Sequence, residues 1–241
     1  MNKLVLLTGA SGGIGKAIIP ILAKKGFVLA LQANNRAEEL SEWISKLGIQ
    51  NCHVFQKELT TELSCSELVS EVEEHLGNIS YLMNNAGINR SASSHKLASN
   101  DWEEVLQVNL SVPFYLSKAV SAAMIDRNFG RIVHMASVVG QMPVAGTIAY
   151  AASKAGLIGM ARAQAADWAK YGITVNCIAP GYLDKGMIQE VPEQMIDRLK
   201  QQIPAKSLGN AEKVANLLVY LFSDEADYVN GETININGGL L

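Results

Sequence analysis

Tyr150 and Lys154 are the side chains in this sequence with the clearest potential for acid–base chemistry. They open a predicted helical segment, where residues at i and i+4 share one face, so the phenol and the ammonium point the same way. A phenol has an ordinary pKa near 10, too high for efficient proton transfer at neutral pH. A neighbouring ammonium lowers that pKa. Taken alone, this spacing also occurs in ordinary surface pairs.

Two more polar residues complete a candidate catalytic group. Ser137 ends a predicted strand and lies 13 residues before Tyr150, and Asn109 lies 28 residues before Ser137. Because motif and context agree, we interpret all four as one site.

A glycine cluster, Thr8-Gly-Ala-Ser-Gly-Gly-Ile-Gly15, follows the first predicted strand and opens a helix. Glycines there allow a tight turn and a close backbone approach to a pyrophosphate, which the N–H groups of the helix N-terminus bind. The alternative is a purely structural turn, which this strand–turn–helix context disfavours. The predicted contacts are Gly9, Ser11, Gly12, Gly13, Ile14 and Gly15.

Composition excludes several classes of protein. The 241 residues carry a formal net charge of −3, so no large positive field is available to hold nucleic acid. Three widely spaced cysteines predict no disulfide framework, and the four histidines show no metal-ligand spacing. No signal peptide or continuous apolar run of 18 residues is visible, which predicts a cytoplasmic protein with no membrane span.

The elements that must position these residues alternate between short apolar strands and longer helices. This order predicts an α/β fold: a single-domain Rossmann-type doubly wound parallel sheet with helices on both faces, over residues 1–241. The predicted strands are 4–7, 28–31, 53–56, 80–83, 131–135, 174–178 and 233–236. The predicted helices are 14–25, 37–46, 67–76, 100–127, 149–171 and 211–222. Residues 181–209 interrupt the rhythm and are interpreted as a substrate lid, the alternative being a surface excursion.

The spacing Gly9-x-x-x-Gly13-x-Gly15 resembles the short-chain dehydrogenase/reductase family. The motifs Asn84-Asn85-Ala86-Gly87 and Pro180-Gly181 extend the resemblance along the chain, and the four candidate catalytic residues match the family's tetrad. The resemblance implies that Tyr150 donates a proton to a carbonyl, Ser137 holds that oxygen, Lys154 binds the nicotinamide ribose and acidifies Tyr150, and Asn109 holds a water. Further implied cofactor contacts are Asn85, Ala86, Gly87, Tyr150, Lys154, Pro180, Gly181 and Leu183.

The residues after the second strand bear on which nicotinamide cofactor is used. An acidic residue there would repel a 2′-phosphate, and residues 32–36 contain none. Asn34 and Arg36 instead favour NADPH, with NADH left open, because the glycine motif carries Gly12 where many NADP-using relatives have a basic residue. Arg36 could also simply solvate the following helix. Glu58 and Leu59 are expected near the adenine.

Within the family, the chain most resembles 3-oxoacyl-[acyl-carrier-protein] reductases, through segments such as 137–140, 172–181 and 236–239. The resemblance implies an acyl carrier protein as partner, in fatty-acid or polyketide-type biosynthesis, with Arg127, Arg131 and Lys170 as candidate docking residues near the cleft. It also implies a homotetramer built on helices 100–127 and 149–171 and the C-terminal strand. Lys185 stands where a threonine is usual, a change at the predicted substrate pocket.

Two other readings stay open. One is a dehydrogenase or reductase of a free alcohol, sugar or ketone, because the fold alone does not select the substrate. The other is a catalytically inactive nucleotide-sensing scaffold, which the complete set of Asn109, Ser137, Tyr150 and Lys154 disfavours.

Overall fold

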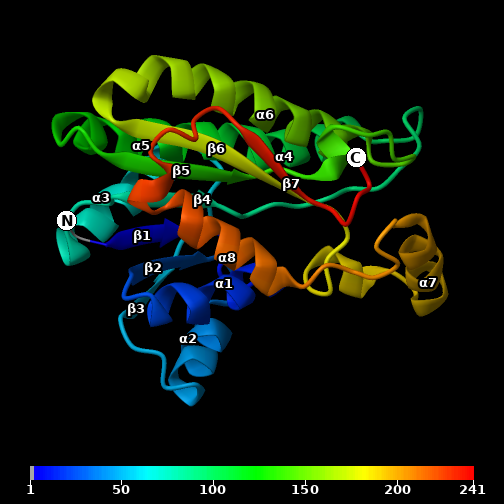
Figure 1. The fold of residues 1–241 in the computed structure, drawn as a ribbon, viewed down its shortest axis with the longest axis horizontal. Coiled ribbons are helices and arrows are strands. Elements are labelled where there is room, and N and C mark those ends of the chain that lie inside the picture. The colour runs from blue at the N-terminus through cyan, green and yellow to red at the C-terminus, as the bar shows by residue number, and fades with distance from the viewer. Residues whose placement is uncertain (1–2) are drawn as a thin grey trace.

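The computed structural model describes residues 3–241 and contains one seven-stranded parallel sheet (Figure 1). Its strand order is β3-β2-β1-β4-β5-β6-β7, so the order reverses between β1 and β4. The strands are β1 Leu4–Leu7, β2 Val28–Ala33, β3 Cys52–Gln56, β4 Tyr81–Asn84, β5 Gly130–Met135, β6 Ile173–Pro180 and β7 Thr233–Ile236. The predicted Rossmann-type sheet is confirmed.

Helices cover both faces of the sheet. They are α1 Gly13–Lys24, α2 Ala37–Lys46, α3 Glu62–Leu76, α4 Ser99–Leu106, α5 Val112–Asp126, α6 Ile148–Trp168, α7 Glu193–Gln202 and α8 Ala211–Leu221. The chain adds a π-helical turn at Gln107–Ser111 and short 3-10 turns at Val138–Gly140, Ala169–Tyr171, Met187–Glu190 and Asp224–Ala226. Helices α1, α2 and α8 pack on one face, and α3, α5 and α6 pack on the other.

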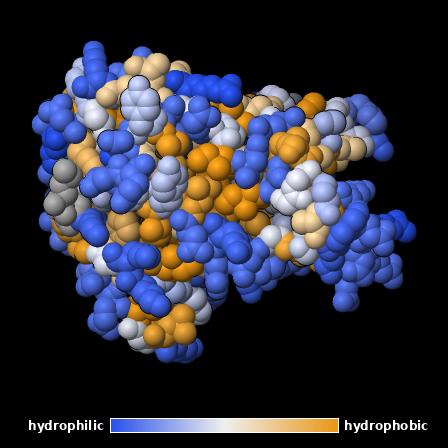
Figure 2. Space-filling model, in the orientation of Figure 1, coloured by the Kyte–Doolittle hydropathy of each residue, from blue (hydrophilic) through white to orange (hydrophobic). Residues whose placement is uncertain are grey.

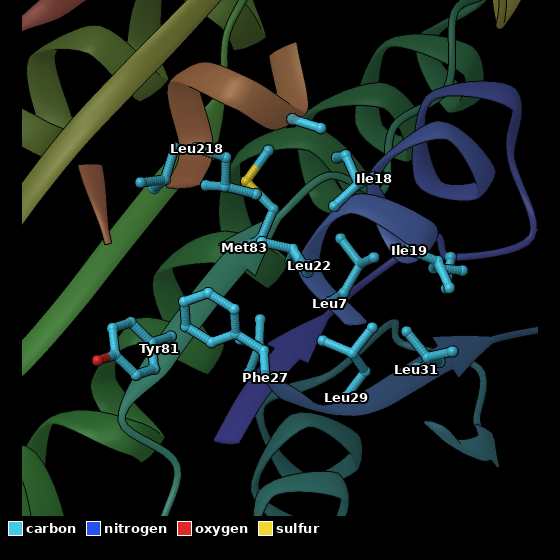
Figure 3. Packing of buried hydrophobic residues seen from close by; sticks show 14 of the residues in the cluster. Leu7, Ile18, Ile19, Leu22, Phe27, Leu29, Leu31, Tyr81, Met83 and Leu218 are labelled. Atoms are coloured by element: carbon cyan, nitrogen blue, oxygen red, sulfur yellow. The ribbon is translucent and has the colours of Figure 1, made fainter. Parts of the chain in front are cut away.

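The core is split in two by the sheet, because successive side chains of a strand point to opposite faces. In β1, Val5 and Leu7 join the cluster under α1 and α8, while Leu4 and Leu6 join the cluster under α3, α5 and α6. Figure 3 shows the first cluster, with Leu22 of α1 and Leu218 of α8 meeting residues of β1, β2 and β4. Burial on both faces explains why these strands lack polar alternation.

The sequence predicts one continuous helix over 100–127, whereas the structure divides this segment into two helices. The chain forms a π turn at Gln107–Ser111 between α4 and α5. Pro113 has no N–H to bond the carbonyl of Asn109, and its ring crowds that carbonyl, so the helix widens there. The combined stretch Ser99–Asp126 is long and apolar enough to cross a membrane by length and composition alone, which is weak evidence for a span, and 44% of its most apolar window is buried.

A second difference concerns α3, which begins at Glu62, five residues before the predicted start at 67. Thr61 accepts a hydrogen bond from the Ser64 backbone N–H, and the Ser64 hydroxyl accepts one from the Thr61 N–H. This capping box stabilises an early helix start.

The segment between β6 and α8 projects from the sheet. It carries α7, which stands apart from the rest of the molecule in Figure 1 and forms a mainly hydrophilic projection in Figure 2. Among the described side chains of α7 none is buried, and Met195 is 53% exposed. The base of the segment is held by pairing of Leu183 with Gly209 and by the Asp184 carboxylate, which accepts from the Ala211 N–H at 2.9 Å.

Candidate functional site

The residues singled out in the sequence follow the carboxyl ends of the strands, at one edge of the sheet. The glycine cluster follows β1, Asn34 and Arg36 follow β2, and residues 85–87 follow β4. Ser137 follows β5 and Gly181 follows β6. Since all the strands are parallel, these segments meet at one edge, beside the point where the strand order reverses. Ligands of open α/β sheets bind at this kind of location.

The glycine cluster is packed so tightly that side chains would not fit. Gly9 has φ +62°, and a Cβ on it would lie 2.8 Å from the Cα of Ala86. A Cβ on Gly13 would lie 2.5 Å from the backbone N of Gly186 and 3.2 Å from the Cβ of Lys185. The base of the projecting segment therefore lies directly against the first turn of α1.

Two polar side chains that were not predicted as site residues, Thr8 and Gln32, stabilise this turn. The Thr8 hydroxyl accepts from the backbone N–H groups of Asn85 and Ala86, at 3.0 and 3.1 Å. Gln32 Oε1 accepts from the Gly9 N–H at 3.0 Å, and its Nε2 donates to the Lys57 carbonyl at 2.6 Å. Their signal was available in the sequence: each is a polar residue at the end of an otherwise apolar strand.

The N-terminus of α1 fits a pyrophosphate. Its N-cap is Gly12, no side-chain cap bond is made there within residues 3–241, and the first turn has no acidic residue. Unpaired N–H groups and the positive end of the helix dipole are thus available to an anion. Ser11 is buried, while Gly12 and Ile14 are half-buried. The chain thus offers backbone N–H groups and the positive end of a helix dipole, which suit a phosphate group.

The predicted adenosine contacts lie at the adjoining edge. Asn34, Arg36 and Glu58 are exposed, and Leu59 is buried. Arg36 is the N-cap residue of α2, and its side chain makes no capping bond in the described chain. Two acidic residues, Glu38 and Glu39, lie in the first turn of α2, and Glu39 is paired with Lys16 at 2.7 Å.

Tyr150 and Ser137 meet through their hydroxyls. Burial raises the pKa of Tyr150, and a hydrogen bond with Ser137 lowers it in part. The Ser137 hydroxyl also accepts from the Val139 N–H at 3.2 Å, which fixes its position after β5. The Tyr150 phenol is therefore protonated at neutral pH, as a proton donor must be.

Lys154 is 2% exposed and donates from Nζ to the Met135 carbonyl at 2.6 Å. Its Nζ lies 5.4 Å from the centroid of the Tyr150 ring, so the two residues do share a face of α6. Burial lowers the pKa of Lys154 to about 8. Burial is the largest influence on the pKa of Tyr150, and the Lys154 ammonium donates to the Met135 carbonyl, so acidification of Tyr150 by Lys154 stays a prediction.

Asn109 sits in the π turn and is fully buried. Its Oδ1 accepts from the Ile88 N–H at 2.8 Å, and its Nδ2 donates to the Ile88 carbonyl and to the Ser153 hydroxyl, at 2.9 and 3.1 Å. A Cβ on Gly87 would lie 3.3 Å from Asn109 Oδ1 and 3.4 Å from Lys154 Nζ. The absence of that Cβ keeps the space between these two groups open.

The remaining predicted contacts line the β6 end of the edge. Pro180 is the last residue of β6, and Gly181 follows it. A Cβ on Gly181 would lie 2.9 Å from the Cα of Asn237, so this glycine permits close packing with the segment after β7. Leu183 is 4% exposed, and its contribution is to anchor the base of the projecting segment.

The predicted basic docking residues do not lie near the cleft. Arg131 is 4% exposed, stacks 4.5 Å over the Phe129 ring and donates to the Gly172 carbonyl, so it cannot meet a partner. Arg127 is half-buried and donates to the Ile79 carbonyl at 2.8 Å, whereas Lys170 is exposed. All three flank the amino ends of β5 and β6, opposite the edge that carries Ser137. The prediction for Arg131 is wrong, because the docking assignment rested on motif position without the direction of the strands.

Comparison with known proteins adds independent findings. The family model described as enoyl-(acyl carrier protein) reductase matches residues 9–241. An acetoacetyl-CoA reductase of Rhizobium meliloti is 38% identical over 99% of this chain and 98% of its own length. A 3-oxoacyl-[acyl-carrier-protein] reductase of Escherichia coli is 37% identical over 99% and 97%, and nodulation protein G of Azospirillum brasilense is 38% identical over 99% and 98%.

A solved structure from Agrobacterium tumefaciens, assigned as a gluconate dehydrogenase, has a TM-score of 0.92 at 29% identity. The alignment covers 98% of this chain and 95% of that one. The relatives are thus named as reductases and as a dehydrogenase, and they share the whole length of the fold. On these matches the chain is an oxidoreductase that uses a nicotinamide dinucleotide, and it belongs to the short-chain dehydrogenase/reductase family.

Proposed function

We propose that this chain reduces a 3-oxoacyl thioester, bound to an acyl carrier protein, to the 3-hydroxyacyl thioester with NADPH. The observation that carries the proposal is the convergence of the Ser137 and Tyr150 hydroxyls beside the buried Lys154, at the edge that holds the glycine cradle. Two hydroxyls aimed at one point suit a carbonyl oxygen. The relatives named as ketoacyl reductases support this substrate class.

The mechanism assigns one task to each residue. The bound dinucleotide supplies the hydride, and the protein supplies orientation and protons. Ser137 donates a hydrogen bond to the substrate carbonyl, and Tyr150, protonated at neutral pH, gives that oxygen its proton. Lys154, whose pKa of about 8 lies close to neutrality, can pass a proton toward Tyr150. Asn109 faces the space beside Gly87 that a linking water would fill.

NADPH is the proposed cofactor because residues 34–36, directly after β2, contain no carboxylate that would repel a 2′-phosphate. Gln32 is turned into the glycine loop, Glu39 is paired with Lys16, and Arg36 is exposed. Arg36→Gln should lower the NADPH-to-NADH ratio of kcat/KM by roughly tenfold or more, the value of one charge-assisted hydrogen bond. Lys46→Gln, at the other end of α2, is the matched control and should leave the ratio unchanged.

The substrate is tested by NADPH oxidation with an acetoacetyl group on carrier protein beside the same group on a short thiol. The proposal predicts a large preference for the carrier. An acidic carrier would meet exposed cations at the catalytic edge, of which Lys96 and Lys185 lie in the segments beside the site. Equal turnover of the two thioesters would contradict the carrier-bound substrate and leave a small-molecule ketone reductase.

A second candidate is the oxidation of a free hydroxy compound. It is favoured by the similarity to the structure assigned as a gluconate dehydrogenase. NADP⁺ or NAD⁺ reduction with hydroxy acids and sugar acids tests it, and turnover there without thioester turnover would replace the first proposal.

We further propose a cytoplasmic homotetramer with a substrate lid over 181–209. Support for assembly comes from large apolar side chains exposed on α5 and α6, Phe114 at 45% and Ile148 at 41%, and from β7 as an edge strand. Solution scattering tests it: a radius of gyration of ~18 Å is the value for a compact monomer of this length and would contradict the tetramer.

A further inference from the structure

His134 is a fully buried titratable residue that the proposed mechanism does not use. It lies on β5, one residue before Met135, and its ring is hydrogen-bonded on both sides. Asn84 Nδ2 lies 3.0 Å from its Nδ1, and Gln164 Oε1 lies 3.1 Å from its Nε2.

The two partners fix which nitrogen carries the proton. Asn84 Nδ2 can only donate, so His134 Nδ1 accepts and Nε2–H donates to Gln164 Oε1. Burial lowers the pKa of His134 to about 4, which keeps the ring neutral as these two bonds require.

The hydrogen bonds continue beyond Asn84. Its Nδ2 also donates to the Ser117 hydroxyl at 3.4 Å, and that hydroxyl donates to the Pro113 carbonyl at 2.7 Å. One buried chain of bonds therefore joins α6, β5, β4 and α5. These elements carry, or run directly into, the segments with Tyr150, Ser137, Gly87 and Asn109.

The same chain gives α6 a second attachment to β5. Lys154 Nζ donates to the carbonyl of Met135, while Gln164 accepts from the neighbouring residue, His134. Along the helix, Lys154 and Gln164 are separated by roughly 15 Å at the usual rise per residue. Two attachments this far apart, together with the apolar packing of α6, restrict pivoting of the helix about Lys154.

We propose that His134 is a positioning residue that holds Tyr150 against Ser137 by clamping α6 to β5 through Gln164. The inference rests on the proposed reaction at Tyr150 and deepens it. It is specific to His134, because within residues 3–241 Gln164 Oε1 bonds His134 alone and Gln164 Nε2 has no hydrogen-bond partner. Loss of His134 leaves the Gln164 carboxamide with no hydrogen bond in that part of the chain.

The test uses His134→Leu, Gln164→Leu and the double variant. A single change leaves a buried polar group unpaired and lowers Tm, whereas replacing both partners by apolar groups can restore stability. A misplacement of about 1 Å costs up to about 100-fold in rate, so kcat should fall roughly 10- to 100-fold in all three variants, the double variant included. His134→Gln, whose amide can donate to Gln164, should recover part of kcat.

Asn176→Ala is the stability-matched control. Asn176 is buried on the next strand, β6, and bonds Val229 and Glu232 away from the tetrad, so its loss should lower Tm with kcat unchanged. If kcat in the Leu/Leu double variant returns to the wild-type value together with Tm, or if Asn176→Ala loses kcat as His134→Leu does, the proposal is overturned.

A readout without turnover separates this inference from the proposed reaction. In protein with ¹³C-labelled tyrosine, the Tyr150 resonance is identified by its loss in Tyr150→Phe. It should shift in His134→Leu and in the double variant and stay in place in Asn176→Ala. A wild-type protein that reduces no thioester would defeat the proposed function alone, whereas an unmoved Tyr150 resonance in the double variant would defeat the positioning role.

Discussion

Helices α6 and α7 both belong to segments beside the catalytic edge, but only α6 is firmly attached to the rest of the protein. Helix α6 buries Ser153, Lys154 and Gln164, each with a hydrogen-bond partner on a neighbouring element. Helix α7 has no buried residue among its described side chains and exposes Met195. The difference agrees with the two roles that we propose, because groups that transfer protons need fixed positions, whereas a segment that covers a substrate must open and close.

The contrast extends to the two halves of the core. The cluster beneath α1 and α8 is formed by apolar side chains and the ring of Tyr81, with the buried Arg131 packed against its Phe129. On the other face, β4, β5, α5 and α6 bury polar side chains that form directional bonds. Directional bonds define one arrangement of neighbouring elements, and a buried polar group without its partner is costly. We therefore expect substitutions on the α6 side to affect rate and those in the lid to affect substrate binding.

The largest expected effect is on the α6 side, at Tyr150. Tyr150→Phe removes the proton donor and keeps the ring, so kcat should fall by at least about 10²- to 10⁴-fold. Cofactor affinity, measured by fluorescence titration, should be unchanged. Turnover close to that of the wild type would remove Tyr150 from the mechanism.

A smaller effect is expected at Gly13, where the base of the segment that carries α7 lies against the first turn of α1. Gly13→Ala puts a Cβ 2.5 Å from the backbone N of Gly186, so the base of the lid must move off the glycine loop. Such overpacking costs about 1–3 kcal/mol, and cofactor affinity should weaken by roughly 5- to 150-fold. Gly159→Ala on α6 is the control, because a Cβ there meets nothing within 4 Å and affinity should be unchanged. Equal affinities for wild type and Gly13→Ala would show that the lid base does not shape the cradle.

The third prediction concerns acid stability. The pKa of His134 is about 4 in the folded chain, below its unfolded value of 6.5, so between these values only the unfolded chain binds this proton. Stability from this residue is therefore full above pH 6.5 and declines as pH falls toward 4, by about 3 kcal/mol in total. In denaturant titrations from pH 7 to 4, the His134→Leu/Gln164→Leu variant should lose less stability than the wild type. Parallel declines would contradict the buried neutral ring.

The smallest effect is expected in the lid itself. Met195→Gln changes an exposed side chain, so the free energy of unfolding should stay within about 0.5 kcal/mol of the wild type. If α7 closes on the acyl chain, the lost apolar contact of about 1 kcal/mol raises KM roughly fivefold and leaves kcat unchanged. An unchanged KM across acyl chain lengths would argue against a lid role for α7.

The features that could be predicted from the sequence are those that depend on local residue patterns. Strands β1, β2, β4, β5 and β6 could be predicted because they are buried on both faces and are mainly apolar. The glycine cradle and the spacing of Tyr150 and Lys154 are local, so they too are visible in sequence. The π turn at Asn109 could have been predicted from Pro113 four residues later.

Long-range polar pairing could not be predicted in this way. His134 and Gln164 are 30 residues apart and meet only when α6 packs on β5. The burial of Arg131 depends on Phe129 and on the Gly172 carbonyl, contacts that no spacing rule reveals. The sequence predicts the type of most elements, but it does not predict which buried polar groups bond to one another.

The most direct test of the central claim follows the hydride. NADPH carrying deuterium at the transferred position is incubated with an acetoacetyl thioester and, separately, with the corresponding α,β-unsaturated thioester. The account predicts a 3-hydroxyacyl product with one deuterium on C3, formed only when Tyr150 is present, and no reduction of the carbon–carbon double bond. Deuterium delivered to the unsaturated thioester, with the 3-oxo compound untouched, would contradict it.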